Sequence, residues 1–221
     1  LVVLTFGLTY VVRLGSPDTK ANDLFIFLSD MTSFLNLFVV IVAASAVAEE
    51  FSRGTIKFLL IRPFSRSQIL AAKAINTLLF ALLGTLVLFL SSFLASNLFL
   101  VSESPFTSTD YNQLPAIVVA LVYAATNLLL IVFYMTMTLF SMAVGLGVAV
   151  LFGSSIINSI MLFAIEKYPW LKWNPFNFMN IKDTVPTLLH QTDMQNAIID
   201  PGLNYWEMTI GLLLYSLLIY F

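Results

Sequence analysis

The chain has 221 residues, of which 59% are hydrophobic and 10% are charged. Soluble domains carry about a quarter charged residues, so a water-soluble fold is excluded and a membrane is the expected solvent. The formal net charge of −2 argues against a nucleic-acid partner. Because cysteine is absent, the chain has no disulfide, no cysteine-ligated zinc and no thiol nucleophile.

Six apolar segments follow one another along the chain. A helix needs roughly 20 apolar residues to cross the hydrocarbon core, and these segments lack the alternation of a membrane β-barrel. Leu1 and Phe221 lie inside apolar runs, so we expect the first and last spans to be cut short. The sequence therefore predicts an all-α polytopic membrane protein, one transmembrane domain over 1–221, with spans at about 1–12, 24–48, 74–100, 114–140, 142–165 and 205–221.

The basic residues orient these helices. Five Lys and Arg residues lie within 49–73, whereas the other five are spread over the longer segments on the opposite side. Because cytoplasmic loops are enriched in Lys and Arg, we expect 49–73 and both termini to lie in the cytoplasm. The outer side then holds an interfacial aromatic belt of Tyr168, Trp170, Trp173, Tyr205 and Trp206.

The cytoplasmic segment between the second and third spans has helical order. Charged residues recur every fourth position from Glu49, and apolar residues form a second face from Phe51. Pro63 ends this helix, and Ser65 with Gln68 forms a capping box that starts the next one. Three interpretations are open: a solvated connector, a helix on anionic lipid, and a docking element for a cytoplasmic partner. The clustered phenylalanines favour the last two.

The stretch AEEFSRGTIKFLLIRPFSRSQILAAK (48–73) resembles the signature of type-2 ABC exporter permeases. In that family an acidic residue precedes a Gly-Thr pair, followed by an apolar stretch, a Pro, a Ser-Arg pair and a Lys that opens the next span. Six spans with this loop between the second and third also fit the family. Among its members the chain looks most like small bacterial permeases that export antimicrobial or amphipathic peptides, such as the bacitracin, lantibiotic and phenol-soluble-modulin exporters.

The resemblance implies that the chain is the membrane subunit of an ATP-driven exporter in the plasma membrane, moving amphipathic or antimicrobial peptides or lipid-like molecules and conferring antimicrobial resistance. The chain lacks the G-x-x-x-x-G-K-[ST] phosphate loop, so a separate cytoplasmic ABC ATPase would bind ATP and Mg. A second permease copy, in a homodimer, and membrane lipid are the other expected partners. No catalytic residue and no cofactor is assigned to this chain. The segment 49–66 would be the coupling helix, with the ATPase-coupling residues Glu49, Glu50, Phe51, Arg53, Gly54, Thr55, Phe58, Leu59, Arg62, Pro63 and Arg66.

Two other function classes stay open. The chain is alternatively a non-transporting scaffold or sensor that recruits a cytoplasmic protein through 49–73, and dependence on ATP hydrolysis in a partner separates this class from the exporter. A secondary transporter is the third class, but the sequence shows neither an internal repeat nor a buried charge pair for ion coupling.

Two polar residues in the second span are candidates for the substrate path. Asp30 is ionisable, and ionisable groups inside spans are functional candidates. It follows the outer boundary at 23–24 by about a turn and a half, so the alternative is contact with head groups or a pair with Arg13 or Lys20. Asn36 lies deeper and is a candidate for an interhelical hydrogen bond.

The remaining polar segments predict no metal site. His190 is the single histidine and has no cysteine partner, and neither H-E-x-x-H nor G-x-S-x-G is present. The segment 166–204 is long for a loop, so we expect structure within it. By the resemblance it is an extracellular gate of short helices that dip into the outer leaflet; alternatively, Trp170 and Trp173 hold it on the lipid surface.

Overall fold

Helices make up the regular structure of the chain. The computed structural model describes residues 1–16, 18–31, 33–52, 66–100, 104–106, 111, 113–139, 149, 152–154, 156–157, 159–160, 164–165, 167–190 and 201–220. In these ranges the β-structure consists of one isolated bridge between Tyr111 and Leu114. Within the described part of the chain, three helical segments are long and apolar enough to cross a membrane: Ala21–Ala46, which is interrupted between Asp30 and Ser33, Gln68–Phe99 and Ala116–Thr138. Two shorter apolar helices, Val2–Gly15 and Tyr205–Ile219, accompany them, in agreement with an all-α membrane protein.

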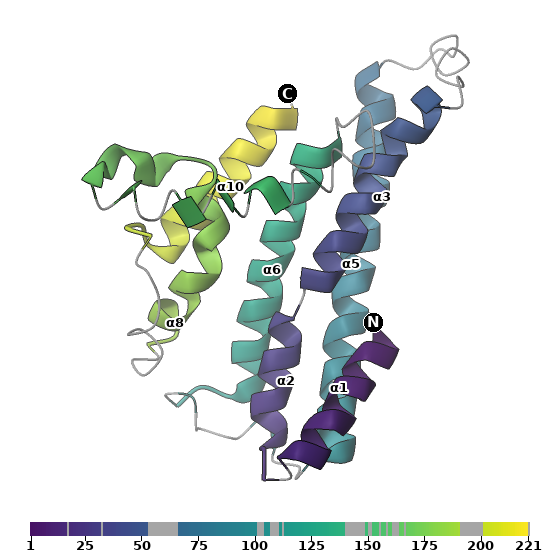
Figure 1. The fold of residues 1–221 in the computed structure, drawn as a ribbon, viewed down its shortest axis with the longest axis vertical. Coiled ribbons are helices and arrows are strands. Elements are labelled where there is room, and N and C mark those ends of the chain that lie inside the picture. The colour runs from purple at the N-terminus through teal and green to yellow at the C-terminus, as the bar shows by residue number, and fades with distance from the viewer. Residues whose placement is uncertain are drawn as a thin grey trace.

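The N-terminal two thirds of the chain form a bundle of long helices (Figure 1). α1 and α2 pack on α5, and α3 lies between α5 and α6. Aromatic edges join α2 to α5, since Phe25 contacts Phe89 and Phe93 with centroids 5.2 and 5.6 Å apart. The bundle comprises α1 (Val2–Gly15), α2 (Ala21–Asp30), α3 (Ser33–Ser52), α5 (Arg66–Phe99) and α6 (Ala116–Leu139).

One predicted span is interrupted. The sequence predicts a continuous helix over 24–48, but α2 ends at Asp30 and α3 begins at Ser33. The chain reads Ser-Asp-Met-Thr-Ser from Ser29, and short polar side chains compete for backbone hydrogen bonds and so favour helix ends. The N–H of Met31 closes α2 by donating to the carbonyls of Phe27 and Leu28, at 3.1 and 3.2 Å.

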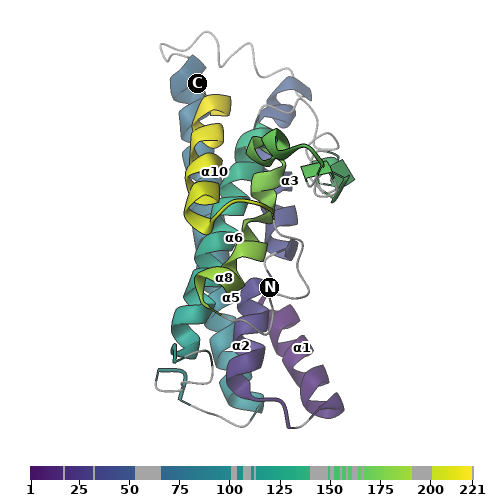
Figure 2. The same ribbon diagram turned by 90° about the vertical axis from the view of Figure 1, so that its left-hand side faces the viewer.

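The last helix, α10 (Tyr205–Tyr220), runs beside α6 in the same direction (Figure 2). Its first residue lies at the middle of α6, where the hydroxyls of Tyr205 and Thr126 are 3.0 Å apart. Its C-terminal end lies at the end of the bundle where α3 stops and α5 starts (Figure 1). The side of the membrane on which this end of the bundle lies stays a prediction.

A helix that runs parallel to its neighbour requires the chain to return between them. The described return consists of η1 (Pro169–Trp173), η2 (Asn177–Thr184) and α8 (Val185–Leu188). It begins near the C-terminal half of α10, where Tyr215 Oη donates to the carbonyl of Trp173 at 3.1 Å. It ends beside the first turns of α6, where Val185 packs on Val119.

The sequence predicts structure within 166–204, and the structure contains the short helices η1, η2 and α8 there, with η2 packed beside the middle of α6. The depth of this segment in a membrane stays a prediction. The predicted aromatic belt is divided, because Trp173 lies near Tyr215 whereas Tyr205 and Trp206 begin α10, ten residues or about 15 Å earlier. Short 3-10 pieces lack the long apolar run that identifies a span, which is why the sequence indicates a loop here. The predicted span 142–165 lies largely outside the described residues.

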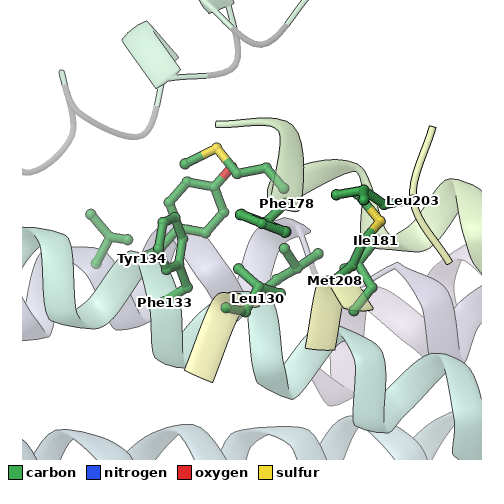
Figure 3. Packing of buried hydrophobic residues seen from close by; sticks show 10 residues of the cluster. Leu130, Phe133, Tyr134, Phe178, Ile181, Leu203 and Met208 are labelled. Carbon is green, nitrogen blue, oxygen red and sulfur yellow. The ribbon is translucent and has the colours of Figure 1, made fainter. Parts of the chain in front are cut away.

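The return segment is held by an apolar cluster. Phe178 and Ile181 of η2 are buried against Phe133 of α6 and Met208 of α10 (Figure 3). Tyr134 adds a hydrogen bond from its hydroxyl to the sulfur of Met179, at 3.5 Å. Burial of one such side chain stabilises the packed state by about 1.5–3 kcal/mol in water. In lipid the same contacts act through close packing, so small residues decide how near the helices approach.

Gly211 lets α10 lie directly against the Phe178 ring of η2, and we predict that Gly211→Ala destabilises the fold. A Cβ at this position would lie 2.4 Å from Cε1 of the buried Phe178 ring. Overpacking of this kind costs about 1–3 kcal/mol, so the midpoint of thermal unfolding in detergent should fall.

Gly7→Ala is the matched control for this prediction. A Cβ at Gly7 meets no atom within 4 Å, so this variant should unfold at or above the wild-type temperature. Phe178→Leu in the Gly211→Ala background removes the ring and should recover part of the loss. Equal midpoints for Gly211→Ala and Gly7→Ala would show that α10 and η2 do not pack as described.

Candidate functional site

The break between α2 and α3 leaves the end of α2 open to partners from other segments. In a continuous helix the carbonyl of Asp30 would accept the N–H four residues later. Here it accepts side-chain donors, from Lys182 Nζ at 3.2 Å and from Asn127 Nδ2 at 3.4 Å. Polar side chains from two other segments therefore replace the missing helical bond.

The side chain of Asp30 is bound by the same two residues. Lys182 Nζ lies 2.9 Å from Oδ1 of Asp30, and Asn127 Nδ2 donates to that oxygen at 3.0 Å. The side chains of Lys182 and Asp30 are 28% and 39% exposed. An ammonium at the C-terminal end of a helix is further stabilised by the negative end of the helix dipole. We name Asp30, Asn127 and Lys182 the polar triad.

The polar triad lies at the middle of the helices that are long enough to cross a membrane. Asn127 is residue 12 of the 24 in α6, about 17 Å from the first residue of that helix. Thr126 and Tyr205 add a hydroxyl pair at the same level. An ion pair at this depth is expensive in lipid, so residues that form one are functional candidates by default.

This geometry corrects the predicted surroundings of Asp30. The sequence suggests a shallow position and a pair with Arg13 or Lys20, but Asp30 is level with the middle of α6 and pairs with Lys182. The partner was missed because 152 residues separate Lys182 from Asp30. The structure also supplies the charge pair that the sequence does not show.

Asn36 does not form the predicted interhelical hydrogen bond through its carbonyl oxygen. Its Oδ1 atom is buried in α3 and has no hydrogen-bond partner in the structure. Asn127 takes the role that was expected of Asn36. A signal for Asn127 exists in the sequence, because it is the one amide in the apolar run AIVVALVYAATNLLLIVFYMTMTL.

The predicted coupling segment is described at its two ends. Glu49, Glu50 and Phe51 belong to the last turn of α3, and Arg66 is the first residue of α5. The ammonium of Lys73 donates to the carbonyl of Ala46 and ties the two helices together at this end. The remaining predicted residues lie outside the described residues: Arg53, Gly54, Thr55, Phe58, Leu59, Arg62 and Pro63.

A cavity of about 590 Å³ adjoins the polar triad. Asp183, next to Lys182, and Tyr205 form part of its wall, and His190 lies at its rim with a positive φ of 54°. Within the described ranges, no cluster of three His, Cys, Asp or Glu side chains could hold a metal ion.

Comparison with known proteins adds a family and one partial relative. The family model described as "Protein of unknown function (DUF2705)" matches residues 2–221. The uncharacterized protein YhcI of Bacillus subtilis (strain 168) is 42% identical over 93 residues, which cover 41% of this chain and 30% of that protein. The chain thus matches less than two thirds of this relative's length. No solved structure matches the chain.

Proposed function

The chain belongs to the DUF2705 family. From the residues of the chain itself, we propose that it is the membrane subunit of an ATP-driven exporter. The observation behind this proposal is the stretch 48–73, which resembles the coupling segment of type-2 ABC exporter permeases. A separate cytoplasmic ABC ATPase binds ATP and Mg, and this chain contributes no catalytic residue. A second copy of the permease completes the transport path.

The position of the coupling segment supports this proposal. α3 and α5 pack against each other, and the chain between Ser52 and Arg66 connects them at one end of the bundle. A docking element on a cytoplasmic ATPase must project from such an end. Exposed apolar side chains cover much of α5, including Leu83, Leu86 and Leu90, and provide a surface for lipid and for a second copy.

The polar triad supports transport over a scaffold function. A scaffold that only recruits a protein through 49–73 has no need of an ion pair at the middle of its spans. Transporters place broken helices and polar groups at this depth, because released backbone groups and charges bind substrates or coupling ions there. In an exporter the triad would lie beside the substrate path, with Asp30 as its central carboxylate.

The same observation favours a second candidate, a secondary transporter. The Asp30–Lys182 pair is a mid-depth charge pair of the kind that couples transport to protons or ions. The two candidates differ in their energy source. Export by the exporter stops when the partner ATPase is inactivated, whereas export by the secondary transporter stops when a protonophore collapses the proton gradient.

Co-purification tests the exporter directly. We expect the tagged chain, extracted from its native membrane in a mild detergent, to retain in stoichiometric amount a protein that contains G-x-x-x-x-G-K-[ST] and hydrolyses ATP. The complex should contain two permease copies. Recovery of the chain alone, or only with proteins that lack a nucleotide site, would overturn the exporter and return 49–73 to a scaffold role.

A further inference from the structure

The cavity beside the polar triad contains an acidic side chain. Its lining residues come from the end of η2, α8 and the start of α10, and they include Asp183, Tyr205 and Trp206. No hydrogen bond or ion pair to another described residue holds the Asp183 carboxylate. Its basic neighbour, Lys182, is occupied by Asp30 at 2.9 Å.

Two aromatic side chains also line the cavity. The rings of Tyr205 and Trp206 meet edge to face, with centroids 5.6 Å apart and planes at 85°. Trp206 is 65% exposed, so its indole face is available to a ligand. Leu188 and Leu203 add apolar surface to the lining. Aromatic faces attract cations through their quadrupole, and the Asp183 carboxylate in the same lining supplies the matching charge.

The start of α10 does not select for an anion. Helix N-termini attract negative charge, but at the start of α10 a side chain of the same helix, Glu207, already supplies a negative charge. The carboxylate of Glu207 accepts the N–H of Asn204 at 2.9 Å, in the arrangement of a capping box. The cavity lining therefore offers a ligand the Asp183 carboxylate, the rings of Tyr205 and Trp206 and the imidazole of His190, while the ammonium of Lys182 is bound to Asp30.

We propose that this cavity binds an organic cation, an alkylammonium or guanidinium group attached to an apolar body. The Asp183 carboxylate is its counter-ion, Tyr205 and Trp206 hold the cationic head, and the leucines contact the apolar part. The inference rests on the proposed function only where it makes this cation the exported substrate. Binding itself requires neither ATP nor a partner protein.

Calorimetric titration of the full chain in lipid nanodiscs tests the site. The probe is benzyltrimethylammonium, and benzyl alcohol is the uncharged aromatic comparison. We expect the cation to bind at least about tenfold more tightly than the alcohol, which is a difference of 1.4 kcal/mol. Asp183→Asn should weaken binding of the cation about tenfold or more, and Trp206→Ala by roughly three- to thirtyfold.

Three further variants keep the test decisive. Asp18→Asn removes an exposed carboxylate in the turn before α2 and should leave binding unchanged. Asp183→Glu keeps the charge and Trp206→Phe keeps an aromatic face, so each should bind better than its disruptive counterpart. Equal affinity for cation and alcohol, or wild-type affinity in Asp183→Asn, would overturn the site. Cation binding without a co-purifying ATPase would reject the exporter alone, and an ATPase without cation binding would reject the site alone.

Discussion

Lys182→Met is expected to destabilise the protein by about 2.5–3.5 kcal/mol, the cost of placing one charge at the centre of a span. The substitution removes the ammonium that lies 2.9 Å from the Asp30 carboxylate. Asn127 cannot replace that positive charge, because its amide is neutral and gives one hydrogen bond to that oxygen. Thermal unfolding in nanodiscs, followed by tryptophan fluorescence, measures the change.

A double-mutant cycle separates the pair from general damage. Asp30→Asn should cost a similar amount, because it leaves Lys182 unpaired. The double variant Asp30→Asn with Lys182→Met removes both charges and should be more stable than either single variant, since it leaves neither charge without its counter-charge. Lys172→Met is the matched control: Lys172 lies 5.9 Å above the ring of Trp173 and has no carboxylate partner among the described residues. Additive costs in the cycle would show that Asp30 and Lys182 do not interact.

Phe58→Asp is expected to abolish export and retention of the ATPase while leaving membrane insertion intact. By the proposed function, Phe58 anchors the coupling segment in a groove of the ATPase, and a charged side chain there is desolvated without a partner. Loss of an interface anchor commonly costs 2 kcal/mol or more, which corresponds to about thirtyfold in affinity. Arg62→Glu should act in the same direction through reversed charge.

Phe106→Asp controls for the general effect of an aspartate on an exposed surface. Phe106 is 62% exposed and lies between α5 and α6, whose connection is at the opposite end of the bundle from 53–65. Export, ATPase retention and membrane content are measured in parallel for the three variants. Full export by Phe58→Asp, or an equal loss in Phe106→Asp, would remove the coupling role assigned to Phe58.

Local signals in the sequence predict most of the helical framework. Uninterrupted apolar runs identify α6 and the end of α5 within two residues, and the run from Tyr205 identifies α10, whereas α5 begins eight residues before the predicted span 74–100. The polar residues from Ser29 to Ser33 favour the break in the second span, although a prediction from hydropathy alone gives a continuous helix there. Helices in lipid depend on length and hydrophobicity, which are local properties, so these elements are readable from the chain.

The candidate site depends on contacts that no local pattern contains. Asp30 meets Asn127 and Lys182 across 97 and 152 residues, and the depth of the pair follows only from the packing of η2 beside α6. The length of 166–204 indicates structure within it, but the packing of η1, η2 and α8 against α6 and α10 is not readable from 3-10 pieces that have the composition of a loop.

By itself, then, the sequence determined a helical membrane protein with a basic connection between its second and third spans. Only the tertiary structure decided which polar groups meet at mid-depth. An unpaired charge in lipid costs several kilocalories per mole, and that cost is relieved only when another segment brings a partner into reach.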